Sequence, residues 1–227
     1  MNEKAMIEHY LGKAITSKQH AMFETYYDYL TEWNQKINLT ALSGKENVYL
    51  KHFVDSLTLV YLMKLDKQTL LDVGSGAGFP SIPLKILFPE IKITIVDSQK
   101  KRINFLKGLT EKLGINATLI HGRIETHTHK GLYDIVTARA VARLNALCEL
   151  CVPFVKEDGH FVAYKGVNYE EELTASRNAL SMLNATINKV KTFDVNEESR
   201  ALIDIVKSGP TPKKYPRQFS KIKSNPL

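Results

Sequence analysis

Cysteine is scarce in this sequence, with only two residues, Cys148 and Cys151, among 227. Two cysteines in a chain of this length give no disulfide framework. Long apolar runs are absent as well, since none approaches the ~20 residues that a transmembrane helix requires. The N-terminal stretch MNEKAMIEHY is polar and lacks the apolar core of a signal peptide. We therefore expect a protein of a reducing, cytoplasmic compartment that does not span a membrane.

Acidic residues are outnumbered, with 24 Asp and Glu against 31 Lys and Arg, which leaves a net charge of +7. The C-terminal stretch 211–227, TPKKYPRQFSKIKSNPL, contains no acid at all. A positive excess of this kind favours an anionic partner such as nucleic acid. We expect this basic tail to be irregular until it binds, and Lys213, Lys214 and Arg217 are the candidates for neutralising RNA phosphates. Solvated disorder without a partner is the alternative for the tail.

Alternating glycines carry the strongest functional signal, in the stretch LLDVGSGAGFP at residues 70–80. They are Gly74, Gly76 and Gly78, and Phe79 then opens a helical pattern. Glycine tolerates positive φ and lets a ligand approach the backbone, so a strand, a glycine turn and a helix start predict a nucleotide-binding corner. A dehydrogenase fingerprint would need its last glycine at position 79. The observed form, D-x-G-x-G-x-G, resembles motif I of S-adenosylmethionine (SAM) methyltransferases, and we expect Asp72 to suit a ligand that carries an ammonium group.

From residue 69 onward, strand-like apolar runs alternate with helical segments. The predicted strands are 69–74, 91–97, 117–122, 133–139, 159–166, 186–194 and 201–207. The predicted helices are 79–88, 98–113, 143–153 and 168–184. This alternation predicts right-handed crossovers and a parallel core, with the last two strands as an antiparallel pair. The expected fold class is α/β, a doubly wound seven-stranded SAM-methyltransferase sheet of the Rossmann-like type.

Residues 1–65 have a helical pattern instead, with Ser17 as the predicted N-cap of one helix and a second helix over roughly 45–63. We therefore expect three parts along the chain. They are an N-terminal helical extension at 1–65, a SAM-dependent methyltransferase domain at 66–210 and the basic C-terminal tail at 211–227.

Further candidate residues stand where the predicted strands end, which in a doubly wound sheet is the edge that binds ligands. Asp97 closes the second strand, and its two oxygens can accept both hydroxyls of an adenosine ribose; capping the next helix is the alternative. Ile124 and Glu125 follow the third strand and suit packing on adenine and reaching its amino group. Arg139 ends the fourth strand, where its planar fork can hold a carboxylate or a phosphate. Lys165 ends the fifth and is a further candidate for contacting RNA.

Familiar catalytic sets are missing from the sequence. Methyltransferases of exocyclic amines usually show Asn or Asp followed by Pro-Pro-aromatic after the fourth strand, and cytosine-C5 enzymes place a nucleophilic Cys there, but residues 137–144 read TARAVARL. The Cys148/Cys151 pair lacks the two further ligands of a zinc site and follows the spacing of a buried helical stripe. His127 and His129 lie in a polar loop without a visible partner. We therefore expect no metal and leave the catalytic residues unassigned.

Several stretches together resemble one family, the glucose-inhibited division protein B family of small-subunit ribosomal RNA methyltransferase G proteins. They are NLTA (38–41), LKHFVDS (50–56), LLDVGSGAGFPSIPL (70–84), VDSQKKRINFL (96–106), TARAVARL (137–144) and TPKKYPR (211–217). The resemblance runs nearly end to end. It implies SAM-dependent methylation of N7 of a guanine in 16S ribosomal RNA, near the decoding region. By matching motif positions, it also implies that Gly74, Phe79, Ile124–Glu125 and Arg139 contact SAM.

The implied chemistry fits the missing catalytic sets. Guanine N7 carries an in-plane lone pair and no proton, so it can attack a sulfonium methyl without a general base, and the enzyme contributes positioning. N7 lies on the major-groove edge, which side chains cannot reach in A-form RNA, so the target should be in a loop or displaced. We expect a monomer that acts on 16S rRNA or the small ribosomal subunit. The alternatives are an NAD-dependent oxidoreductase and a noncatalytic RNA-binding module.

Overall fold

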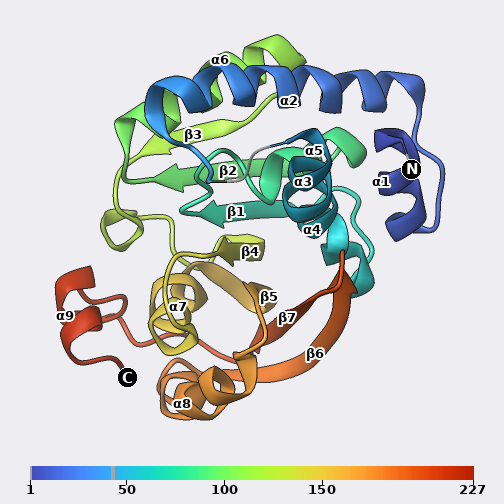
Figure 1. Ribbon diagram of the computed structural model, residues 1–227. Coiled ribbons are helices and arrows are strands. Elements are labelled where there is room, and N and C mark those ends of the chain that lie inside the picture. Colours follow the sequence, from blue (N-terminus) through green and yellow to red (C-terminus); the bar gives the residue numbers. More distant parts are fainter. Residues whose placement is uncertain (1, 42–43) are drawn as a thin grey trace.

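One seven-stranded sheet runs through the computed structural model, which describes residues 2–41 and 44–227, in the order β3-β2-β1-β4-β5-β7-β6 (Figure 1). The strands are β1 (Thr69–Val73), β2 (Lys92–Asp97), β3 (Thr118–His121), β4 (Tyr133–Arg139), β5 (Val155–Lys165), β6 (Ala185–Val195) and β7 (Glu198–Lys207). The first five are parallel, whereas β7 is antiparallel to both β5 and β6. The predicted fold class and strand pairing are confirmed.

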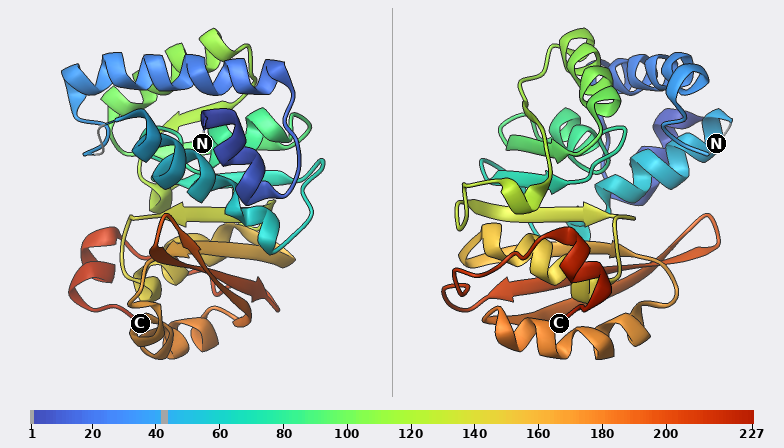
Figure 2. Two further views of the ribbon diagram at one scale, coloured as in Figure 1. Left: turned by 45° about the vertical axis from the view of Figure 1, so that its right-hand side comes forward. Right: turned by 90° about the vertical axis from the view of Figure 1, so that its left-hand side faces the viewer.

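Alternation along the strands sends neighbouring residues to opposite faces of the sheet. Leu70 of β1 joins a core that contains the N-terminal helices, whereas Leu71 joins a second core on the other face. The first face is covered by α2 (Ser17–Ile37), α5 (Ser81–Leu87) and α6 (Lys100–Leu113). The second is covered by α7 (Leu144–Cys151) and α8 (Tyr169–Met182). Figures 1 and 2 show α2 lying alongside α6, with α7 and α8 at the opposite end of the molecule.

The N-terminal region is helical, as predicted, but its details differ. Helix α1 (Glu3–Leu11) precedes α2, whose N-cap is Thr16 and not Ser17, because the Thr16 side chain accepts from Gln19 N and Gln19 bonds back to Thr16. The predicted helix over 45–63 is a composite that ends at Tyr61. It consists of α3 (Lys45–Val48), the π-helix η1 (Tyr49–Val54), α4 (Asp55–Leu57) and the 3-10 helix η2 (Thr58–Tyr61). A π-helical turn is a rare geometry that is frequent at functional sites.

The basic tail packs against the second face. Residues 211–218 have no helix or strand, as expected, but the expectation of an irregular tail is wrong for 219–224. It contains the helix α9 (Phe219–Ser224), which contacts α7. Tyr215 and Ile222 are 2% and 0% exposed. These two side chains are buried in the second core and hold the tail against it, which the basic composition of the tail did not suggest.

Cys148 and Cys151 are free thiols buried in the same core, which confirms the reading of C-x-x-C as a helical stripe. Among the residues that the structure describes, no three His, Cys, Asp or Glu side chains group as a metal site. Over the same residues, no helix has the length and apolarity to cross a bilayer.

Candidate functional site

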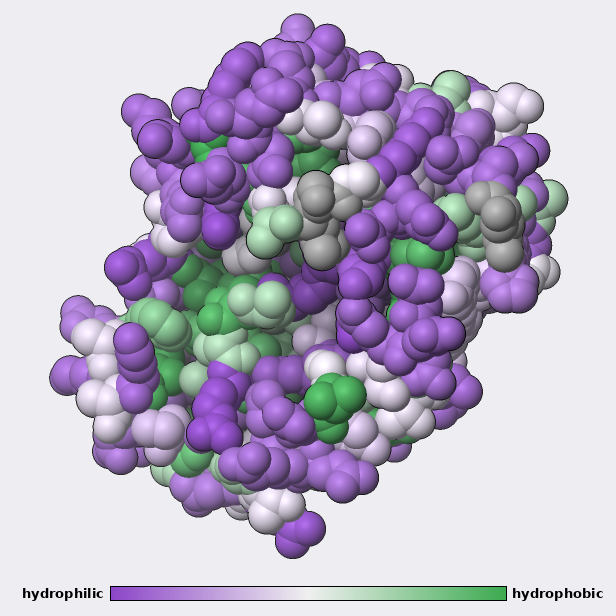
Figure 3. Space-filling model, in the orientation of Figure 1, coloured by the Kyte–Doolittle hydropathy of each residue, from purple (hydrophilic) through white to green (hydrophobic). Residues whose placement is uncertain are grey.

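Two cavities open at the carboxyl edge of the parallel strands, where Figure 3 shows a hollow with apolar residues on its floor. The smaller cavity, of about 120 Å³, is the glycine recess, lined by Gly74, Val96, Ile124, Glu125, Leu150 and Phe219. The larger, of about 510 Å³, is the arginine cavity, lined by Asp55, Arg139, Lys165, Phe193 and Arg200. Val141 lines both cavities, which therefore lie next to one another.

The glycine loop is held open by backbone bonds to the neighbouring strand. Gly74 N donates to Val96 O at 2.8 Å, and Gly76 N donates to Asp97 Oδ2 at 3.2 Å. A Cβ on Gly78 would approach Ile82 to 2.7 Å, and one on Gly74 would approach Val141 to 2.8 Å, whereas nothing lies within 4 Å of one on Gly76. The lack of a side chain at Gly78 therefore lets Ile82 pack against the loop, and the lack of one at Gly74 lets the 140–142 loop approach closely. Gly76 is the glycine of the three that faces open space.

Asp72 does not face the cavities, and the expectation that it meets a ligand's ammonium group is wrong. Its side chain is fully buried, where Oδ1 accepts from Thr137 Oγ1 and Oδ2 accepts from Ser81 N. Burial raises the pKa of Asp72 to about 7, although these hydrogen bonds act in the opposite direction and lower it. The acid therefore ties β1 to β4 and to the first turn of α5, beneath the glycine loop.

Asp97 closes β2 as predicted, and its carboxylate is 2% exposed. Oδ1 accepts from Gln99 N at 2.8 Å, and Oδ2 accepts from Gly76 N and lies 3.4 Å from the Arg102 guanidinium. Gln99 is the N-cap of α6, so Asp97 does not cap this helix. The carboxylate thus couples the open glycine of the loop to the start of α6. Its role toward a ribose stays a prediction.

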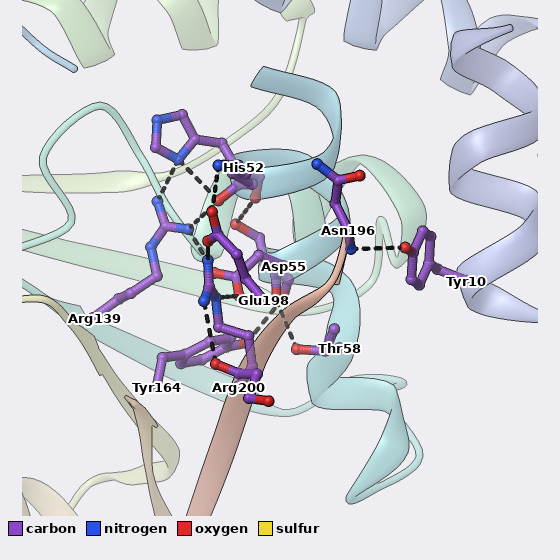
Figure 4. A network of polar contacts seen from close by, with 12 residues as sticks. Tyr10, His52, Asp55, Thr58, Arg139, Tyr164, Asn196, Glu198 and Arg200 are labelled. Atoms are coloured by element: carbon purple, nitrogen blue, oxygen red, sulfur yellow. Dashed lines mark hydrogen bonds and ion pairs between the residues drawn. The ribbon is translucent and has the colours of Figure 1, made fainter. Parts of the chain in front are cut away.

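A buried polar network stands at the end of β4 (Figure 4). Arg139, whose side chain is 16% exposed, donates to Asp55 Oδ2 at 2.7 Å and to His52 Nδ1 at 3.2 Å. Asp55 also lies 3.4 Å from Arg200. The Arg139 guanidinium stands 4.9 Å from the centre of the Phe79 ring, which packs on His52 at 4.5 Å. The ring of Phe79 is thus a support for Arg139.

Because a guanidinium can only donate, His52 Nδ1 acts as the acceptor toward Arg139, and its 3.1 Å approach to Lys51 O is then a contact without a shared proton. The ring proton belongs on Nε2, 2.7 Å from Thr40 Oγ1. Burial, reinforced by the positive charge of Arg139, lowers the pKa of His52 to about 3. His52 is therefore neutral near pH 7 and holds the arginine as a hydrogen-bond acceptor.

This pKa predicts a pH dependence of stability. An unfolded histidine takes up a proton near pH 6.5, whereas folded His52 does so only near pH 3, so the folded state loses stability as pH falls through this window. We expect the wild type to lose about 2.5–3 kcal/mol relative to His52→Gln between pH 7.5 and 4.5. Urea unfolding of both proteins at the two pH values measures this difference. Asp72, whose raised pKa acts in the opposite direction, is common to both proteins and cancels; parallel pH profiles would contradict the assignment.

The structure brings Gly74, Ile124 and Glu125 together in the glycine recess, as the sequence predicted. Ile124 is 5% exposed and begins the 3-10 turn η3 (Ile124–Thr126) after β3. The Glu125 side chain, however, is turned toward the tail, where Oε1 accepts from Phe219 N at 3.2 Å. Arg139 lies in the adjoining arginine cavity.

Two of the predicted RNA contacts are engaged inside the protein. Lys165, with 9% of its side chain exposed, lies 2.6 Å from Glu172 and donates to Ala142 O. Arg217 forms a bidentate pair with Glu149, which is fully buried. These pairings argue against either side chain as a free phosphate contact, and we revise both assignments. Lys213 and Lys214 are exposed and remain predicted RNA contacts.

Several residues of the site carried no individual signal in the sequence. His52 and Asp55 lie inside the stretch LKHFVDS. His52 is in the π-helix η1 and Asp55 follows it directly as the first residue of α4, and a π-helical turn has no recognisable periodicity in the sequence. Tyr26, on α2, donates to Ala77 O at 2.5 Å and so joins the glycine loop to the helices on the first face of the sheet. Phe219 lies in a basic tail that indicated only RNA.

Comparison with known proteins gives a family match over most of the chain. The model of the family described as GidB, rRNA small subunit methyltransferase G, matches residues 19–203. A protein of Halalkalibacterium halodurans named Ribosomal RNA small subunit methyltransferase G is 50% identical over 224 residues, which cover 95% of this chain and 94% of that protein. A protein of the same name from Bacillus subtilis is 46% identical, with 95% and 94% covered.

Solved structures share the fold at low identity. A methyltransferase from Pyrococcus furiosus superposes with a TM-score of 0.59 at 14% identity. The match covers 86% of this chain and 100% of that one. TYW2 from M. jannaschii, solved in complex with AdoMet, has a TM-score of 0.59 at 11% identity and covers 74% and 79% of the two chains. Identities this low establish the architecture alone.

Proposed function

The chain belongs to the rRNA small subunit methyltransferase G family, and we propose that it transfers a methyl group from SAM to N7 of a guanine in 16S ribosomal RNA. In this proposal the adenosine end of the cofactor occupies the glycine recess, its carboxylate end reaches Arg139 in the arginine cavity, and the target base enters the rest of that cavity. The oxidoreductase and noncatalytic alternatives find no support in the named relatives. We infer in addition that the protein works as a monomer in the cytoplasm.

The observation that carries the proposal is that the two cavities adjoin at Val141, which lines both. The residues fit SAM along this line. Ile124 and Val96 offer apolar surface to adenine, and Asp97 stands beside the open glycine Gly76, where a ribose diol would lie. Arg139, at the far side, offers a planar fork suited to a carboxylate.

SAM, when bound, supplies an electrophilic methyl group on a sulfonium. Guanine N7 has a free in-plane lone pair, so the chain's own residues need only hold the two reactants in line and exclude water. The 140–142 loop is placed to do this, because it borders both cavities and Ala140 adopts φ 56°. A non-glycine residue at positive φ is held there by its surroundings, and such strain clusters at ligand sites. We therefore assign catalysis to positioning and no residue to a general base.

The RNA would approach from the side of the arginine cavity. Arg143, with 68% of its side chain exposed, stands at its rim, and the protein carries a net charge of +7. Phosphate contacts position a nucleic acid without reading its sequence. Specificity for one guanine then rests on the shape of the cavity and on the RNA structure that displaces the base.

Asp97→Ala is expected to weaken binding of S-adenosylhomocysteine by roughly 1.5–3 kcal/mol, the range for a hydrogen bond to a charged group. The reason is loss of the ribose acceptor together with the support of Gly76 N. Calorimetric titration of the wild type and the variant measures it, with Asp134→Asn, which lies at the opposite end of the sheet on β4, as the control. An unchanged dissociation constant would show that another group holds the ribose.

The same calorimetry tests the cofactor itself. The wild type is expected to bind S-adenosylhomocysteine and to show no comparable affinity for NAD. Tighter binding of NAD would overturn the proposed function.

A further inference from the structure

We propose that residues 217–222 of the tail form a wall of the cofactor site and that the Phe219 ring is a contact for adenine. This inference rests on the proposed function, since it takes the glycine recess to be the adenine end of the SAM site. It changes the expected role of the tail, because the sequence indicated a segment that serves RNA alone.

The position of Phe219 is the first observation. Phe219 lines the glycine recess together with Ile124, Val96 and Leu150, which come from η3, from the end of β2 and from α7. Phe219 is the one residue lining this recess, among those the structure describes, that comes from beyond β7. The recess is otherwise aliphatic or polar, so this ring supplies its aromatic surface.

The segment is anchored on both sides of Phe219, which is the second observation. Its own N–H donates to Glu125 Oε1 at 3.2 Å, so the chain that bears the ring is joined to the predicted adenine-binding turn. Arg217 Nε and Nη2 donate to the two oxygens of Glu149 at 2.7 and 2.6 Å, and this carboxylate is 0% exposed. Ile222, one turn further along α9, is fully buried. These contacts fix the segment that carries Phe219 beside the recess.

The chemistry of this wall matches a flat heterocycle. A purine has two π faces, which pack well on aromatic and aliphatic side chains. Stacking on an aromatic ring stabilises any bound base, because every base has such a face. The Glu125 carboxylate, engaged with Phe219 N, then acts on the cofactor through the tail as a positioning residue. Binding of the adenine and docking of the tail are consequently linked, because each completes the other's surface.

The test uses the full-length protein and S-adenosylhomocysteine as the probe. Phe219→Ala should raise the dissociation constant roughly 5- to 150-fold, the range for loss of an aromatic partner from a stacked base. Lys223→Ala, which alters an exposed residue of α9 outside this segment, is the matched control and should leave it unchanged. In methyl transfer, Phe219→Ala should raise the KM for SAM while kcat at saturating SAM stays near that of the wild type. A purely structural defect would lower both affinity and kcat together with thermal stability.

A second variant keeps the inference testable if Phe219→Ala fails to fold. Phe219→Trp retains an aromatic ring, and its emission should be quenched when S-adenosylhomocysteine binds. The wild type, whose single tryptophan Trp33 packs on Phe105 of α6, should show no such quenching. Wild-type binding with an unchanged Phe219→Ala constant, or an unresponsive Phe219→Trp, would overturn this inference alone. Failure of the wild type to bind the probe would overturn the proposed function with it.

Discussion

Arg217→Ala is expected to lower the free energy of unfolding by about 3–5 kcal/mol, because it leaves the carboxylate of Glu149 buried without its partner. Glu149 is 0% exposed and accepts two bonds from the guanidinium and one from Arg217 N. The melting temperature should fall by roughly 6–20 °C for a domain of this size. Thermal and denaturant unfolding of the variant and the wild type measure the loss.

Arg143→Ala is the matched control, because it removes an arginine from an ion pair that is open to water. The side chains of Arg143 and Glu171 are 68% and 76% exposed, and such pairs contribute at most about 1 kcal/mol. The double variant Glu149→Leu/Arg217→Met, which removes both charges, should recover most of the loss. Equal, small effects of Arg217→Ala and Arg143→Ala would show that Arg217 is not a structural anchor and would restore it as an RNA candidate.

Arg139→Ala is expected to weaken S-adenosylhomocysteine binding about 10- to 150-fold, the equivalent of 1.5–3 kcal/mol for a charged hydrogen bond. It should also destabilise the fold, since Asp55, at 5% exposed, would keep only the more distant Arg200. Calorimetry gives the first effect and urea unfolding the second.

The two effects of Arg139→Ala are separable. The double variant Arg139→Ala/Asp55→Asn removes the uncompensated charge and should regain stability, but it should not regain affinity, because the fork that meets the ligand is still missing. Recovery of both properties in the double variant would mean that Arg139 is structural only and that SAM binds without it.

The contrast between Arg139 and Arg217 shows what the sequence could and could not predict. Strands and helices follow from periodicity over a few neighbouring residues, and their ends place Gly74, Asp97 and Arg139 at one edge of the sheet. Pairings between distant segments leave no local pattern. Arg217 reaches Glu149 across 68 residues, and Arg139 reaches Asp55 across 84.

The same reason accounts for the corrected assignments. A basic tail without acids is typical of a solvated segment, and only the burial of Tyr215 and Ile222 against the second face shows it to be ordered. Lys165 lies at the ligand edge as predicted, but Glu172, on a helix that follows it, neutralises the charge. Asp72 stands next to the glycine loop in sequence, but its carboxylate is bonded to Ser81 of α5 and Thr137 of β4 inside the protein, and neither contact leaves a local pattern in the sequence.

The most direct test of the proposed function is methyl transfer from labelled SAM to unmodified 16S rRNA, supplied both as naked RNA and in assembled small subunits, followed by nucleoside analysis. The protein is expected to transfer label to one site, recovered as 7-methylguanosine, and Arg139→Ala should abolish or strongly reduce it. Label recovered in any other nucleoside, or no transfer to either substrate by a protein that binds S-adenosylhomocysteine, would contradict the assignment of this site to guanine-N7 methylation.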